Sequence, residues 1–208
     1  MWQTLTHFPL QPYFAFLAGG ILLNLTPGQD VLFATASGVK GGPRAGMMAG
    51  LGVGLGALWH MALAALGLSA LIAAHAGALL ALKYAGAAYL LYIAWKSWND
   101  TGAAGHSKTA TSGWDALRKG ALTNALNPKP ILFMLAFLPQ FIQPQIGPAW
   151  QQILLLGLTF GLTGTLITAG YGYLAGRAGH AIGARMGVLN KGAAVLFAGL
   201  AARLILED

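Results

Sequence analysis

Two long stretches without a charged residue constrain this chain more than any other feature. No Asp, Glu, Lys or Arg occurs between Arg44 and Lys83, or between Lys129 and Arg177. Each stretch exceeds the roughly 20 apolar residues that a membrane-spanning helix needs. Over the whole chain 56% of the residues are hydrophobic and 8% are charged, whereas soluble domains are nearer to one quarter charged. The sequence therefore predicts an all-α polytopic membrane protein.

The apolar segments predict six transmembrane helices, at about residues 10–38, 43–73, 77–98, 118–141, 148–176 and 181–205. One connection, about 99–116, has the composition of a polar loop. The first apolar segment follows no Lys or Arg and shows no cleavage pattern, so we expect a retained span rather than a signal peptide. We expect residues 1–208 to form a single transmembrane domain.

The formal net charge of +7 predicts membrane topology rather than nucleic-acid binding, because the basic residues are scattered singly between apolar segments. The first, third and fifth connections carry basic residues, and the second and fourth carry none. The positive-inside rule then places those three connections in the cytoplasm and both termini outside. Lys83 and Arg203 are exceptions that lie near span ends, where a long side chain can reach the interface. Because the chain has no cysteine, disulfides and thiolate metal sites are excluded.

A proline motif recurs in the two halves of the chain. "LTPGQDVLF" at 25–33 resembles "LNPKPILFM" at 126–134, and the glycine-rich segment at 50–56 resembles that at 157–164. Three spans per half is an odd number, so the second half enters the membrane from the opposite side. The pattern predicts two inverted three-helix repeats, at about 10–98 and 117–206, joined by a cytoplasmic loop at about 99–116. Two unrelated proline kinks are the alternative.

Both proline motifs are expected to interrupt their helices near the middle of the membrane. Proline lacks an N–H, and its ring clashes with the preceding turn. Thr26 as N-cap, Pro27 at the first helical position and Gln29 at the third predict a capping box that starts a second half-helix. Asn127 is expected to cap a half-helix that starts at Pro128. Each half-helix presents free N–H groups and partial positive charge, so the two ends together suit a carboxylate or another anion.

Asp30 lies in the first turn after one interruption, and Lys129 lies at the equivalent place in the other half. A carboxylate at mid-membrane is costly unless it is partnered, hydrated or protonated, and Lys129 is the expected partner. Three roles stay open for Asp30: it binds a substrate ammonium group, takes up a coupling proton, or only balances Lys129 and the helix dipole. His60 is a weaker candidate, since a lone intramembrane histidine more often joins two helices by a hydrogen bond.

These residues resemble the LysE/RhtB-type amino-acid exporters, the homoserine/threonine and lysine efflux translocators. The family's first span carries a motif like N-P-T-P-G-P-D, which Asn24, Thr26, Pro27, Gly28 and Asp30 match. The segments "LKYAGAAYLLYIAWKSW" (82–98) and "LTNALNPKPILFMLAFLPQF" (122–141) are similar to its third and fourth spans. Leu25 and Gln29 stand where the usual motif has prolines, so the interruption is expected to differ in shape.

The resemblance implies export of an amino acid or related small metabolite from the bacterial cytoplasm across the inner membrane, by exchange with protons. No cluster of His, Asp and Glu has metal-ligand spacing, and no catalytic motif or carboxylate pair lies within a span. We therefore expect no metal, no cofactor and no enzymatic activity. Membrane lipids are expected to surround the protein, and a homo-oligomer stays open. Export of a cation or another metabolite, an uncoupled channel and an intramembrane enzyme are the alternatives. The residues expected to bind substrate or couple transport are Asn24, Thr26, Pro27, Gly28, Gln29, Asp30, Asn127, Pro128, Lys129 and His60.

Overall fold

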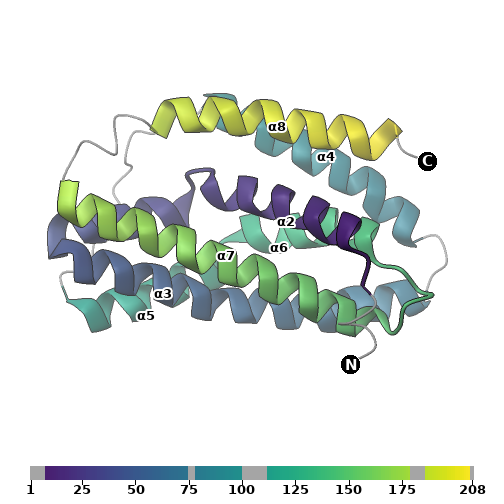
Figure 1. Ribbon diagram of the computed structural model, residues 1–208, viewed down its shortest axis with the longest axis horizontal. Helices are drawn as coiled ribbons and strands as arrows, with labels where there is room; N and C mark the ends of the chain where they lie inside the picture. The colour runs from purple at the N-terminus through teal and green to yellow at the C-terminus, as the bar shows by residue number, and fades with distance from the viewer. Residues whose placement is uncertain (1–7, 75–77, 100–111, 179–185, 207–208) are drawn as a thin grey trace.

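The computed structural model describes residues 8–74, 78–99, 112–178 and 186–206 (Figure 1). Every regular element within these ranges is helical, which confirms the all-α prediction for the described part of the chain. The elements are α2 (Leu10–Leu25), α3 (Gln29–Ala74), α4 (Ala78–Asn99), α5 (Gly113–Ala125), α6 (Pro128–Phe137), the 3-10 turn η1 (Leu138–Phe141), α7 (Ala149–Ala178) and α8 (Met186–Leu206).

The helices run along one long axis in three layers (Figure 1). α4 and α8 pack against each other on one side, and α3 packs against both α5 and α7 on the other. The short helices α2 and α6 lie between these layers. Their phenylalanines form the centre of the core: Phe16 of α2 and Phe133 and Phe137 of α6 are each at most 2% exposed. This arrangement places the C-terminal end of α2 and the N-terminal end of α6 inside the molecule.

α3 contains the last part of the first predicted span and the whole of the second, joined at a sharp break. The backbone leaves helical geometry at Gly42, where φ is 80° and ψ is 177°, and Pro43 follows. A positive φ is accessible to glycine at little cost, and proline cannot donate to the preceding turn. The predicted boundary between the segments at 10–38 and 43–73 is therefore confirmed.

Membrane-spanning character is clear for part of the described chain. Gln29–Leu68 and Ala149–Ala178 are long and apolar enough to cross a membrane, although the first contains the break at Gly42. α5 and α6–η1 form a third span if the pair, bent by 46°, is taken as one. α2 is apolar but shorter, at 16 residues. The described helices thus give two or three such spans, and the six-span count stays a prediction.

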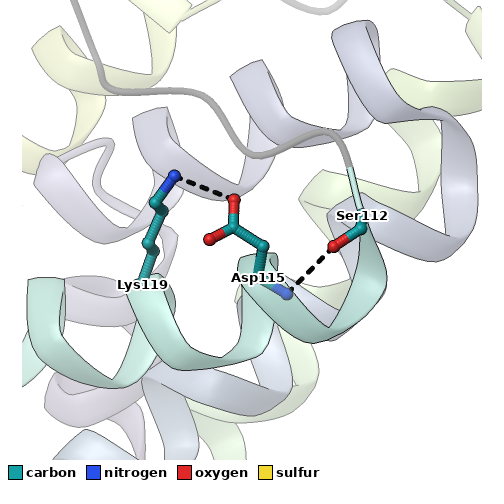
Figure 2. A network of polar contacts seen from close by, with 3 residues as sticks. All are labelled: Ser112, Asp115 and Lys119. Atoms are coloured by element: carbon teal, nitrogen blue, oxygen red, sulfur yellow. Dashed lines mark hydrogen bonds and ion pairs between the residues drawn. The ribbon is translucent and has the colours of Figure 1, made fainter.

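α5 begins earlier than the sequence predicted. The expected loop at about 99–116 ends at Ser112, and the helix starts at Gly113 rather than near residue 118. The hydroxyl of Ser112 accepts a hydrogen bond from the backbone N–H of Asp115 at 3.2 Å, and the ammonium of Lys119 lies 2.8 Å from the Asp115 carboxylate (Figure 2). An N-cap serine followed by an acid in the first turn favours a helix start, so this polar stretch is helical.

Glycines join α3 to α7 along one face of each helix. A Cβ at Gly46 would overlap the carbonyl oxygen of Gly172, and a Cβ at Gly172 would overlap that of Gly46. Gly50 lies equally close to the backbone of Ala169, and Gly176 to that of Pro43. Small residues let two membrane helices approach to backbone contact. We call Gly46, Gly50, Gly172 and Gly176 the glycine seam.

Candidate functional site

The two helix interruptions meet in the centre of the molecule. The regular helix is interrupted between α2 and α3 at Thr26–Gly28, and between α5 and α6 at Leu126–Asn127. Two hydrogen bonds join them: the ammonium of Lys129 donates to the carbonyl oxygen of Thr26 at 3.1 Å, and the side-chain amide of Asn127 donates to the Asp30 carboxylate at 3.0 Å. The structure thus brings together the two motifs that the sequence singled out.

The predicted capping box at the first interruption is wrong. Thr26 closes α2 instead of starting α3: its hydroxyl donates to the carbonyl oxygen of Leu22 at 2.8 Å. α3 begins two residues later than expected, at Gln29, with the carbonyl oxygen of Gly28 accepting from the N–H of Leu32 at 2.8 Å. A threonine hydroxyl can bond the carbonyl four residues back as readily as it can cap the next helix. With Thr26 bonded to Leu22, Gln29 is the first residue of α3, and its side chain is exposed.

The second interruption follows the prediction. Asn127 has extended backbone angles, φ −79° and ψ 117°, and its side-chain oxygen accepts from the N–H of Lys129 at 3.0 Å. Pro128 occupies the first helical position, where its missing N–H costs no hydrogen bond. The Asn127 side chain therefore has two functions, since its oxygen caps α6 and its amide nitrogen holds Asp30.

Two asparagine amides hold the Asp30 carboxylate. Oδ2 accepts from Asn124 at 2.8 Å and from Asn127 at 3.0 Å. Oδ1 is buried, and among the described residues it has no hydrogen-bond partner. The side-chain oxygen of Asn124 is in the same state, in a residue that is only 3% exposed. Acceptor oxygens buried in this way favour a ligand that donates hydrogen bonds.

The charge of Lys129 acts on Asp30, as the sequence predicted, but the hydrogen bonds of the two side chains go to other groups. The ammonium of Lys129 donates to a backbone carbonyl that the first interruption has freed, that of Thr26, while the Asp30 carboxylate takes its hydrogen bonds from asparagines. The lysine charge still lies in the same site, because Lys129 and Asp30 line one cavity. The site therefore combines one acidic and one basic side chain.

Side chains of α7 support the first interruption. The hydroxyl of Tyr171 donates to the carbonyl oxygen of Leu25 at 3.2 Å. The amide of Asn24 donates to the carbonyl oxygen of Phe160 at 3.2 Å and contacts the hydroxyl of Thr163 at 3.1 Å. Irregular backbone at membrane depth is tolerated where protein satisfies its polar groups. Asn24 thus joins α2 to α7 and also lines the central cavity.

His60 joins two helices. Its Nε2 lies 2.7 Å from the carbonyl oxygen of Asn124, so this nitrogen carries the proton and donates. His60 is 3% exposed and is absent from the lining of the central cavity. The structure places it behind Asn124, so it supports a residue that holds Asp30. This geometry is that of the helix-to-helix hydrogen bond described above as the more common role.

Asn124 is the site residue that sequence reasoning missed. It lies one helical turn before Asn127, in "NALNPK", so its side chain reaches the same acid. The signal that could have identified Asn124 is its position three residues before the capping Asn127, which brings it near the same intramembrane acid. Among the described residues, no group of three or more His, Asp or Glu side chains is arranged to hold a metal ion.

Two cavities adjoin the interruptions, and a third lies farther along α6. The central cavity, about 40 Å³, contains Asp30, Asn124 and Lys129 in its lining. The α4 cavity, about 340 Å³, lies between α4 and the starts of α3 and α6, and Pro27, Gln29 and Pro128 line it. The outer cavity, about 520 Å³, lies at the other end of α6; its lining residues are Gln11, Pro12, Ala15, Lys83, Phe137, Gln140, Phe141, Gln143, Leu200 and Arg203.

Substitution of Asn127 by alanine is expected to lower the free energy of unfolding by about 1–3 kcal/mol. The variant loses the N-cap of α6 and one of the two donors to a buried carboxylate. Thermal unfolding in detergent would measure the change. Asn99→Ala is the matched control, because Asn99 is exposed and its side chain donates to the carbonyl of Trp95 within its own helix at 2.8 Å. Equal melting temperatures for the two variants would contradict the assigned role of Asn127.

Sequence comparisons identify the family of the chain. The family model of the LysE type translocators matches residues 21–208. The homoserine/homoserine lactone efflux proteins of Salmonella typhimurium and Salmonella typhi are each 36% identical over 189 residues, which cover 89% of this chain and 91% of each relative. An uncharacterized membrane protein of Vibrio cholerae is 33% identical over 172 residues, 82% of this chain and 83% of the relative. No solved structure matches the chain. The chain therefore belongs to the LysE-type translocator family of multi-pass membrane transport proteins.

Proposed function

We propose that this protein exports an amino acid, with homoserine as the first candidate, from the bacterial cytoplasm by exchange with protons. The observation that carries the proposal is the pair of opposite charges at the meeting point of two interrupted helices. Asp30 and Lys129 line one cavity and come from the two halves of the chain. Half-helix ends at such interruptions are typical of binding sites in secondary transporters.

The site suits a zwitterion. The substrate ammonium group bonds the buried oxygens of Asp30 and Asn124, which lack hydrogen-bond partners among the described residues. The substrate carboxylate lies toward Lys129 and the N-terminal ends of α3 and α6, where free N–H groups and partial positive charge favour an anion. Two relatives are named for efflux of homoserine and homoserine lactone, and both compounds carry an amine. The amine is therefore the group that Asp30 recognises.

Proton exchange follows from the same carboxylate. Among the described residues Asp30 is the one acidic side chain in the central cavity lining, and its protonation removes the charge that holds an ammonium group. A proton that enters from outside thereby releases the substrate, and loss of that proton to the cytoplasm restores the site. In this scheme substrate and proton compete for Asp30.

The proposed architecture is six spans in two inverted repeats within the inner membrane, with both termini outside. Two contacts support the orientation, because they bring basic residues to the same end of the molecule. Gly176, next to Arg177, lies against the backbone of Pro43, and Gly113 at the start of α5 lies against Arg44. The positive-inside rule assigns that end to the cytoplasm. The helix pairs also support the repeat, since α4 packs on α8 as α3 packs on α7.

Reconstitution in liposomes tests the proposal. We expect efflux of homoserine to rise when the pH outside is lower than inside, and external homoserine to stimulate efflux of labelled homoserine by counterflow. An uncoupled channel would show no counterflow. Flux of homoserine that is independent of the pH gradient would reject proton exchange, and no flux of any amino acid would reject the proposed function as a whole.

A further inference from the structure

We propose that the α4 cavity is the site where substrate first binds from the cytoplasm, and that it receives the carboxylate end of an amino acid. The inference rests on the proposed function and orientation given above. It adds a second binding site, one that precedes the central cavity on the transport path and is selective for substrates with a free carboxylate.

Size separates the two cavities. The central cavity of about 40 Å³ has room for a few water molecules, since one water needs about 10–15 Å³. The α4 cavity of about 340 Å³ lies within the range of small-molecule sites, about 300–1,000 Å³. In this conformation an amino acid therefore fits beside the interruptions but not between them.

A thin polar partition separates the α4 cavity from the central one. Gly28, Asn127 and Lys129 line both cavities. The ammonium of Lys129 spans the partition, because it donates to the carbonyl oxygen of Thr26 and lies 3.3 Å from the place of a Cβ at Gly28. A group that draws the ammonium away from Thr26 would therefore open the partition.

The charges around the α4 cavity favour an anion. Lys129 lies at the partition and Lys96 on the last turn of α4, and among the described lining residues there is no Asp or Glu. α3 and α6 both begin at this cavity, so their N-terminal ends add partial positive charge. The rings of Tyr89 and Tyr92, whose centroids are 6.1 Å apart, form part of its apolar wall. A carboxylate next to Lys129 and an aliphatic part against the tyrosines fit these surroundings.

Packed phenylalanines separate the central cavity from the outer cavity. Phe160 lines the central cavity, and Phe137 lines the outer one. Phe133 lies between them, with ring centroids 5.5 Å from Phe160 and 4.8 Å from Phe137. The ring of Phe137 packs directly on Gly19, since a Cβ at Gly19 would come within 2.6 Å of a carbon of that ring. The polar partition therefore separates the central cavity from the α4 cavity, and the packed rings separate it from the outer cavity.

Because the chain contains no cysteine, single cysteines can report access to the cavity. Ser97→Cys places a thiol in the α4 cavity, and Gln29→Cys is a second position in the same lining. Leu91→Cys is the matched control, on the same helix but outside the lining and 47% exposed. A charged methanethiosulfonate reagent reacts with thiolates in water. In inside-out vesicles we expect it to modify the two cavity positions at least about tenfold faster than Leu91→Cys.

Homoserine and its lactone distinguish recognition of the carboxylate from recognition of the amine. Both compounds have the amine, but the lactone has no free carboxylate. We expect homoserine to slow modification of Ser97→Cys and the lactone to protect poorly. In a Lys129→Gln background, half-protection by homoserine should need about tenfold more ligand, since a charge-assisted hydrogen bond is lost, while weak protection by the lactone stays unchanged.

Equal protection by the two compounds would overturn the assignment to a carboxylate. Modification of both cavity positions no faster than that of Leu91→Cys would overturn the cavity as an access site. Homoserine efflux by the unmodified single-cysteine variants is measured in parallel. Efflux without protection rejects the α4 cavity alone, whereas absence of efflux from the wild-type protein rejects the proposed function.

Discussion

Replacing Asp30 by asparagine is expected to reduce amino-acid efflux by about 10- to 100-fold while the protein still inserts and folds. The substrate ammonium loses a charge-assisted hydrogen bond of about 1.5–3 kcal/mol, and each 1.4 kcal/mol corresponds to about tenfold. The variant keeps the shape of the side chain, and its carbonyl oxygen can still accept from Asn124 or Asn127 at the position of Oδ2. Efflux from preloaded proteoliposomes, normalised to inserted protein, measures the effect.

Asp115→Asn is the control for Asp30→Asn. Asp115 is 41% exposed and pairs with Lys119 one turn along α5 (Figure 2). Exposed pairs at this spacing contribute only about 0.3–0.5 kcal/mol, so efflux should stay within about twofold of wild type. If Asp30→Asn transports as fast as Asp115→Asn, the carboxylate of Asp30 neither binds substrate nor carries the proton.

Replacing Gly172 by leucine is expected to destabilise the folded protein by about 3 kcal/mol or more, above the typical range for overpacking. The new Cβ would overlap the backbone of Gly46. No rotamer change relieves this clash, because the backbone of Gly172 fixes the position of the Cβ. α3 and α7 would have to separate, and the support that α7 gives to the first interruption through Tyr171 and Asn24 would be lost. The yield of folded protein after detergent extraction, and its unfolding temperature, measure the effect.

Gly170→Leu, two residues away on α7, is the matched control. A Cβ at Gly170 meets nothing within 4 Å, and leucine is a better helix former than glycine by roughly 0.5–1 kcal/mol. This variant should be as stable as wild type or slightly more stable. If both leucine variants destabilise the protein equally, the effect comes from the leucine itself, and the glycine seam does not hold the two helices together.

The places where the helices are interrupted could be predicted from local chemistry. Proline at 27 and 128 stops a helix whatever surrounds it, and Asn127 has one short-range choice, which is to cap the helix that follows. Thr26 has two choices of similar energy, the preceding carbonyl or the following N–H, and the tertiary structure selected the first. The predicted capping box failed for that reason. The start of α5 was missed because its composition is polar, although Ser112 and Asp115 carry the capping signal.

The hydrogen-bond partners of the two charged side chains could not be predicted from sequence. Symmetry between the halves made Lys129 the expected partner of Asp30, but hydrogen bonding depends on the relative height and rotation of α3, α5 and α6. Those helices bring Asn124 and Asn127 to the acid and the lysine to a freed carbonyl. The same packing turns His60 toward the backbone of Asn124 rather than into the cavity.

By itself the sequence determined that the chain is helical, that it is apolar enough for a membrane, and that two proline motifs interrupt it. These properties follow from composition and from backbone chemistry within a few residues. Only the tertiary structure decided which groups meet at the interruptions, because distant side chains such as Tyr171 and Asn124 satisfy the freed backbone and the buried acid. It also decided that Gly28, Asn127 and Lys129 separate two cavities, since a partition exists only once helices from both halves are packed.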